Sequence, residues 1–144
     1  MKTLGEAADR MPPGGTMSAE AFRAAMRPYR TAWLEGELAR GEYDESLVVI
    51  NRLIAVEPSS GELMFFLGEA YRRRGGEGDL QQARDSYQRA IAASVPFPTA
   101  YRGLGLVSMK MGDKPAAKQA FTTYLERAPN ADDRAMIQFY LQSL

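Results

Sequence analysis

A spacing of 34 residues recurs along this chain and constrains its fold more than any other feature. Gly41 and Gly75 are separated by this distance, and so are Ala83 and Ala117. A fixed period of about 20 to 50 residues is typical of architectures that stack copies of one supersecondary unit. Each copy then buries its apolar face against its neighbours along the stack.

Each unit is predicted to be a pair of helices. Apolar residues recur at spacings of three and four, and strand-like alternation is nowhere sustained. The predicted helices span about residues 18–27, 28–40, 43–56, 61–74, 80–93, 98–111, 114–127 and 131–143. Because short turns between helices make neighbours antiparallel, we predict an all-α solenoid of antiparallel helix hairpins.

Turn and capping residues mark the ends of these predicted helices. We expect a left-handed glycine at three helix ends: Gly41, Gly75 and Gly112. Ser59 and Asp79 are each followed three residues later by Glu or Gln, which is the spacing of a capping box. Asp113 can cap the helix that follows it.

Composition excludes several kinds of chemistry. The 144 residues include no cysteine and no histidine, and 18 basic residues balance 18 acidic ones. Disulfides, thiol or imidazole catalysis and Cys/His metal sites are therefore absent. The charge balance argues against a broad nucleic-acid surface, and no apolar run approaches the roughly 20 residues that span a bilayer. We expect no cofactor, no metal, no nucleic acid and no membrane insertion.

Two glycine-containing stretches look at first like phosphate loops. Gly103 and Gly105 lack the preceding strand and the third glycine of a dinucleotide fingerprint, so we place them inside a helix. The arginines at 72–74 precede two glycines, but no Gly-Lys-Ser/Thr follows, so they are interpreted as a helix C-terminus. The carboxylates are scattered, and we predict that the chain is not an enzyme.

Aligned on its period, the chain resembles the tetratricopeptide repeat family, whose pattern is W-x2-L-G-x2-Y, then A-x3-F, then P. Residues 98–131 carry Tyr101-x2-Leu104-Gly105, Ala117-x3-Phe121 and Pro129. Residues 61–97 carry Met64-x2-Leu67-Gly68-x2-Tyr71, Ala83-x3-Tyr87 and Pro96. A weaker copy at 27–60 carries Arg30-x2-Trp33-Leu34, Ser46-x3-Ile50 and Pro58.

The resemblance implies a domain over residues 17–144 that follows a flexible segment at 1–16. It holds about three repeats (27–60, 61–97 and 98–131) and a C-terminal capping helix at 132–144. The N-terminal helix, which presents Phe22, is expected to cap the first repeat; alternatively it lies in the groove of its own chain or of a second subunit. The resemblance also implies that Gly68 and Gly105 face Ala83 and Ala117 of the partner helices. Small residues on both sides would let the backbones approach closely.

The family fold further implies a concave groove lined by the first helix of each repeat. The groove residues expected here are Glu35, Phe65, Glu69, Arg72, Arg102, Leu106 and Met109, with Thr31, Leu38, Glu62, Arg73, Thr99 and Lys110 also facing it. The lysine/asparagine clamp of one subclass is absent. The implied function is a non-catalytic scaffold that binds a protein or peptide partner in this groove.

Two alternatives stay open. Leu63–Gly76 and Arg134–Leu141 are similar to tetratricopeptide modules attached to bacterial envelope zinc metallopeptidases, so the chain could recruit substrate for a larger enzyme; no HExxH occurs in it. Self-association as a homodimer is the other alternative. We expect a cytoplasmic protein if Met1 is the native start, and a periplasmic or envelope one if the chain is a fragment of an exported protein.

Overall fold

The computed structural model describes residues 18–144, and within this range every regular element is a helix. The helices are α2 (Ala19–Ala39), α3 (Tyr43–Val56), α4 (Gly61–Arg74), α5 (Asp79–Ala92), α6 (Ala100–Lys110), α7 (Lys114–Arg127) and α8 (Arg134–Ser143). The predicted all-α class is confirmed, and most helix ends fall within two residues of their predicted positions. The flexible segment predicted for residues 1–16 lies outside the described residues.

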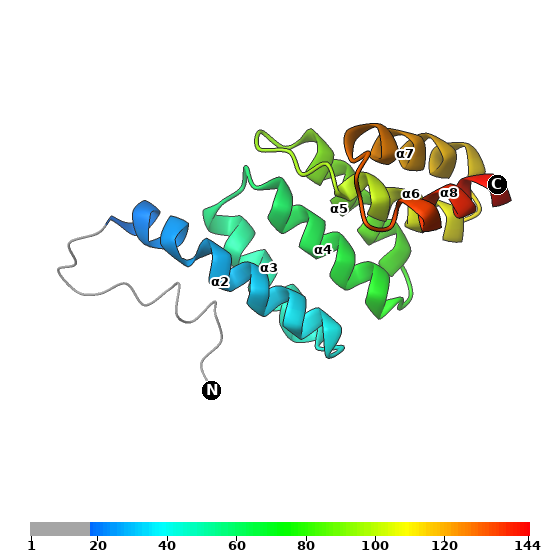
Figure 1. The fold of residues 1–144 in the computed structure, drawn as a ribbon. Helices are drawn as coiled ribbons and strands as arrows, with labels where there is room; N and C mark the ends of the chain where they lie inside the picture. The colour runs from blue at the N-terminus through cyan, green and yellow to red at the C-terminus, as the bar shows by residue number, and fades with distance from the viewer. Residues whose placement is uncertain (1–17) are drawn as a thin grey trace.

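The helices stack as successive hairpins (Figure 1). In each pair the second helix packs along the first: α3 on α2, α5 on α4 and α7 on α6. Helix α4 also contacts α2 on one side and α6 on the other, so the first helices of the three pairs form a continuous wall. Helix α8 packs on α7 at the C-terminal end.

The predicted glycine turns are confirmed. Gly41, Gly75 and Gly112 have φ angles of 78°, 63° and 81°, the left-handed region that side chains with a Cβ rarely adopt. The predicted cap at Asp113 is confirmed as well, because its carboxylate accepts a hydrogen bond of 3.2 Å from the backbone N–H of Ala116. These contacts end one helix and start the next within a few residues.

Two predicted caps are wrong. Helix α4 is capped by Ser60 rather than by Ser59, and the Ser60 hydroxyl accepts a hydrogen bond of 3.2 Å from the Leu63 N–H. Asp79 is the first residue of α5 instead of its cap, and its carboxylate accepts a hydrogen bond of 2.9 Å from the Gly76 N–H. From the first position of α5, the Asp79 carboxylate thus reaches back and closes the longer turn that precedes the helix.

The predicted break between helices 18–27 and 28–40 is absent, because Ala19–Ala39 is one helix with Pro28 inside it. A proline removes one hydrogen bond and costs about 3 kcal/mol in a helix interior. The neighbouring turns are exposed here, so water can satisfy the freed carbonyl of Ala24. The two helices predicted on either side of Pro28 are therefore one continuous helix.

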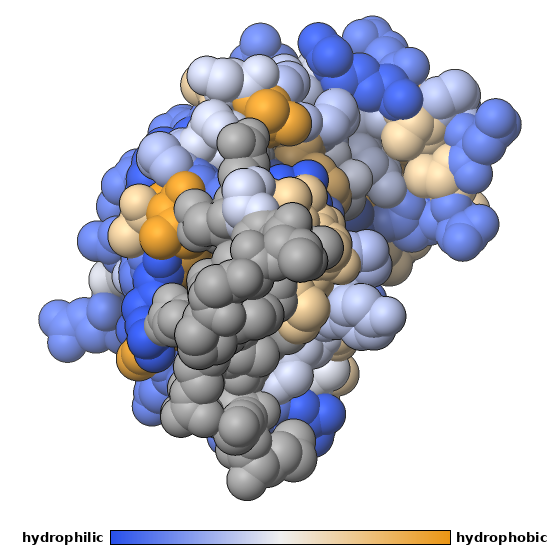
Figure 2. All heavy atoms as spheres, turned by 90° about the vertical axis from the view of Figure 1, so that its left-hand side faces the viewer, coloured by the Kyte–Doolittle hydropathy of each residue, from blue (hydrophilic) through white to orange (hydrophobic). Residues whose placement is uncertain are grey.

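The first turns of α2 do not form a separate capping helix. They project beyond the first hairpin at the N-terminal end of the stack (Figure 1). The following residues of this part are exposed: Ala21, Ala24, Ala25, Arg27, Pro28 and Tyr29. The contacts predicted for Phe22 lie outside what the structure describes. In the view of Figure 2, the coloured residues are largely hydrophilic and the hydrophobic ones form small separate groups.

Three glycines of α4 and α6 lie directly against aromatic rings, whereas we predicted alanines opposite Gly68 and Gly105. A Cβ added to Gly68 would lie 2.7 Å from the Tyr87 ring, and one added to Gly103 would lie 2.3 Å from the same ring. A Cβ on Gly105 would lie 2.4 Å from the Phe121 ring. Both rings are fully buried. The atoms nearest to Gly68 and Gly105 are thus ring atoms of Tyr87 and Phe121, and the ring occupies the space that each glycine opens.

Adjacent repeats are also joined through their loops. The Gly61 N–H donates to the Val95 carbonyl at 2.8 Å, and the Val95 N–H donates to the Ser59 carbonyl at 3.1 Å. A Cβ on Gly61 would lie 2.5 Å from that Val95 oxygen, so only glycine permits this approach. The contact links the α3–α4 loop to the α5–α6 loop and holds one edge of the wall together.

The surroundings of two glycines predict opposite effects of Gly→Ala substitutions on stability. Gly103→Ala should lower the free energy of unfolding by about 1–3 kcal/mol, because the methyl group meets a buried ring that cannot move away. Gly36→Ala in α2 meets only the mobile end of Arg40 at 3.2 Å, and should raise stability by about 0.5–1 kcal/mol. Urea unfolding followed by circular dichroism measures both. Equal effects of the two substitutions would contradict the packing described here.

Candidate functional site

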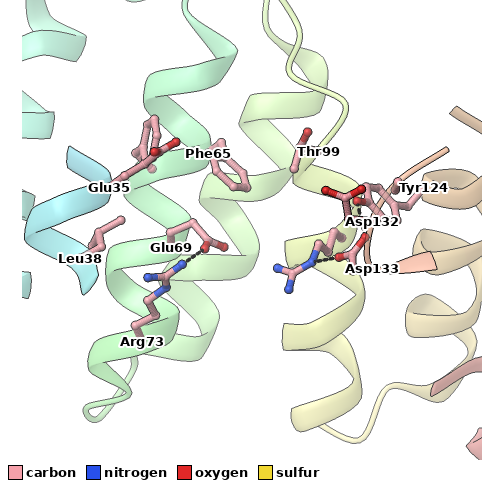
Figure 3. Close-up of a pocket in the computed structure, with 12 residues that line it drawn as sticks. Glu35, Leu38, Phe65, Glu69, Arg73, Thr99, Tyr124, Asp132 and Asp133 are labelled. Carbon is pink, nitrogen blue, oxygen red and sulfur yellow. Dashed lines mark hydrogen bonds and ion pairs between the residues drawn. The ribbon is translucent and has the colours of Figure 1, made fainter. Parts of the chain in front are cut away.

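The wall of first helices is hollowed by a pocket of about 480 Å³ (Figure 3). Helices α2, α4 and α6, together with α7 and the α7–α8 connection, contribute to its lining. The lining residues are Glu35, Leu38, Phe65, Phe66, Glu69, Arg73, Thr99, Arg102, Tyr124, Ala131, Asp132 and Asp133. It is an open hollow between neighbouring repeats, with three aromatic residues and several charged residues in its lining.

Phe65 is the aromatic group that remains half-exposed in this pocket. Its ring contacts Phe97 with 5.0 Å between centroids, Phe66 with 5.4 Å and Tyr87 with 6.1 Å. These contacts fix the ring against the hairpin core on one side. A fixed aromatic surface in a hollow can bind an apolar group at little conformational cost.

Beside Phe65 lies the buried carboxylate of Glu69, which is 2 % exposed. It accepts hydrogen bonds from the Tyr87 hydroxyl at 2.5 Å, from Arg72 at 3.1 Å and from Arg73 at 2.9 Å. Burial by itself raises the pKa of Glu69, but Arg72, Tyr87 and Arg73 together outweigh burial and hold this pKa below its usual value. Glu69 is thus ionised and paired.

The opposite wall of the pocket holds a second paired carboxylate. Asp133 accepts hydrogen bonds from Arg102 at 2.5 Å and from the Tyr124 hydroxyl at 2.9 Å. Burial by itself raises the pKa of Asp133, but these two donors outweigh burial and lower it. Burial and the hydrogen bond to Asp133 raise the pKa of Tyr124 to about 12, so this hydroxyl stays protonated and donates at neutral pH.

The same contact recurs between successive first helices. The Thr31 hydroxyl donates to Glu62 at 3.1 Å, and Arg102 donates to Asp133, in both cases across 31 residues of sequence. The periodic fold therefore places a donor on one first helix opposite a carboxylate at the start of the next. The second of these contacts, between Arg102 and Asp133, lies in the lining of the pocket.

Four of the seven predicted groove residues line the pocket: Glu35, Phe65, Glu69 and Arg102. Arg72 lies behind it, where its guanidinium donates to Glu69 and, at 3.0 Å, to the Tyr87 hydroxyl. Leu106 and Met109 lie elsewhere. They pack in the C-terminal core cluster around Phe121 and Ile137, to which α8 contributes. The C-terminal capping helix was predicted, but the repeat period does not show which side chains of α6 pack in the core beneath it.

Sequence reasoning missed Tyr124, Asp132 and Asp133 as pocket residues. One signal could have found Asp133, because it lies one 34-residue period after Thr99, which was expected to face the groove. Tyr124 belongs to a second helix, and the motif gives such positions only a core role. Asp132 enters through the turn before α8, whose path the repeat pattern does not determine.

The described residues carry no obvious catalytic arrangement. No group of three or more carboxylates in residues 18–144 is placed to hold a metal ion. Glu69 and Asp133 are each bound by arginine and tyrosine side chains, which leaves these carboxylates poor proton acceptors. Along the same part of the chain, no helix has both the length and the apolar character needed to cross a membrane.

Comparison with known protein families identifies the family of this chain. The tetratricopeptide repeat pattern matches residues 31–77 and 76–132, which is more than half of the chain. The chain belongs to the tetratricopeptide repeat family. Repeats of this family generally mediate protein–protein interactions and are typically non-catalytic scaffolds. No curated protein matches the chain, and the resemblance to modules of envelope metallopeptidases stays a prediction.

The Glu69 pairing predicts a pH-dependent loss of stability in Glu69→Gln. At neutral pH the variant should lose about 1–3 kcal/mol of unfolding free energy, because two arginines lose their buried partner. The folded pKa of Glu69 is lowered from 4.5, so this contribution is complete above that value and disappears as pH falls through the lowered pKa. Urea unfolding at a series of pH values measures it.

Glu126→Gln is the matched control, since Glu126 is exposed on α7 and lies away from the pocket. Its stability should follow that of the wild type at every pH. A difference between wild type and Glu69→Gln that stays constant down to the lowest pH would contradict the pairing.

Proposed function

We propose that the concave pocket binds a peptide segment of a protein partner. The observation that carries this proposal is Phe65, a half-exposed ring held in place by three other aromatic rings in a hollow of about 480 Å³. Volumes of about 300–1,000 Å³ are usual for ligand sites. The general role of the family supports a protein partner.

The chemistry of the lining favours a peptide over a small metabolite. The pocket is open along the wall and combines one aromatic surface with carboxylates, guanidinium groups and a hydroxyl at its sides. An extended segment can place one apolar side chain on Phe65 while its polar groups meet the charged walls. Interfaces of this kind gain most of their affinity from a few aromatic and arginine contacts.

Filling the pocket tests the proposal without removing a core contact. Thr99 is exposed, lines the pocket and does not cap α6 through its side chain. Thr99→Trp should therefore abolish binding of peptides selected from a displayed library, with little change in melting temperature. Thr122→Trp, at an exposed position on α7 outside the pocket, should retain binding. Fluorescence anisotropy measures both affinities, and equal binding by the two variants would refute the assignment of the pocket.

Helix α8 favours self-association as a second candidate function. Phe139 is 65 % exposed and Met136 is 37 % exposed on this terminal helix, whose ten residues include a single charge, Arg134. An uncharged apolar face suits contact with an identical copy, because no like charges meet across the symmetry axis.

If α8 mediates a dimer, Phe139→Glu should convert it to a monomer, because each copy would bury a charge without a partner. Thr122→Glu on α7 adds the same charge at an exposed position of another helix and should leave the mass unchanged. Light scattering at several concentrations gives the mass of each protein. A wild type that stays monomeric at every concentration would reject this second candidate.

A further inference from the structure

We infer that the partner segment carries a lysine or arginine side chain next to the apolar group that meets Phe65. This inference rests on the proposed function of the pocket and adds the charge of its ligand. It follows from which charges of the lining are already paired and which are not.

The lining contains more acidic than basic groups. Four carboxylates reach the pocket, from Glu35, Glu69, Asp132 and Asp133. Two guanidinium groups reach it, from Arg73 and Arg102. The lining therefore has two more carboxylates than guanidinium groups, and Arg72 behind the pocket balances one of these two negative charges.

Both pocket arginines already have a carboxylate partner. Arg73 donates to Glu69 at 2.9 Å, and Arg102 donates to Asp133 at 2.5 Å. An anionic ligand could use the remaining N–H groups of either guanidinium, but it would share the positive charge with a carboxylate that is already bound to it. Because their charge is already balanced, these arginines attract an acidic side chain or a C-terminal carboxylate less strongly than unpaired guanidinium groups would.

The other two carboxylates are available. Glu35 and Asp132 are exposed, and among the described residues neither forms a hydrogen bond or an ion pair. Figure 3 shows them on opposite sides of the pocket, with Phe65 and Thr99 between them. A cationic side chain entering the hollow from the wall can therefore approach an unpaired carboxylate on either side.

Phe65 adds a second attraction for such a group. The aliphatic stem of a lysine or arginine packs well on an aromatic ring, while its charged head stays at the surface. A guanidinium or ammonium group over a ring face gains about 0.5–1 kcal/mol at an exposed site. One ring with a free carboxylate on each side is thus a binding site for a basic residue next to an apolar one.

The test uses three labelled synthetic peptide pools that share one central aromatic residue. Their other positions are Lys and Arg in the basic pool, Asp and Glu in the acidic pool, and Ser and Gln in the uncharged pool. Anisotropy with the wild-type chain should show the tightest binding for the basic pool. This binding should weaken as the salt concentration rises from about 0.1 to 1 M, because salt shortens the Debye length and screens the charges.

Substitutions then test which carboxylate binds the basic side chain of the peptide. Glu35→Gln and Asp132→Asn should each weaken binding of the basic pool by about two- to fivefold, the range for an exposed ion pair. Their matched controls, Glu126→Gln and Asp85→Asn, change the same charge outside the pocket and should not weaken binding. Loss of binding that is equal in variants and controls would overturn the inference.

The pools separate failure of the inference from failure of the proposed function. Equal or tighter binding of the acidic or uncharged pool, still blocked by Thr99→Trp, would overturn the cationic preference and leave the pocket a peptide site. Binding of none of the three pools would overturn both.

Discussion

The structure depends on how closely α4 and α6 approach the ring of Tyr87. The ring, on α5, lies against Gly68 of α4 and Gly103 of α6, and a single methyl group at either glycine would overlap it. One buried side chain therefore sets the spacing of three helices from two hairpins. Since protein interiors are close-packed, such a contact admits little adjustment, and the wall of first helices takes its form from it.

The same side chain connects the core to the pocket. The Tyr87 hydroxyl donates to Glu69 at 2.5 Å and accepts from Arg72 at 3.0 Å, so the inner edge of the pocket is tied to the ring that separates the repeats. Burial and the neighbouring Glu69 carboxylate raise the pKa of Tyr87, which keeps the hydroxyl a donor. Tyr87 thus takes part both in helix packing and in the charge network of the pocket. The unpaired carboxylates of Glu35 and Asp132 are exposed and lie outside this network.

The period made much of the fold predictable, because helix length, glycine turns and the inward face repeat together; Phe65 and Glu69 were assigned to the groove on that basis. The packing of Leu106 and Met109 in the core was not predictable in this way, because a motif gives the face of a helix but not which side chains pack against that face. Here the core cluster at α8 takes up both side chains. The role of Gly103 was also hidden, because the residue it contacts lies on another hairpin.

A double-mutant cycle between Gly103 and Tyr87 tests the central contact most directly. The free energies of unfolding are measured for the wild type, Gly103→Ala, Tyr87→Leu and the double variant. If the ring excludes the methyl group, Gly103→Ala destabilises the wild type but costs little or stabilises the Tyr87→Leu background, with a coupling of about 1–2 kcal/mol. The same cost of Gly103→Ala in both backgrounds would contradict the account.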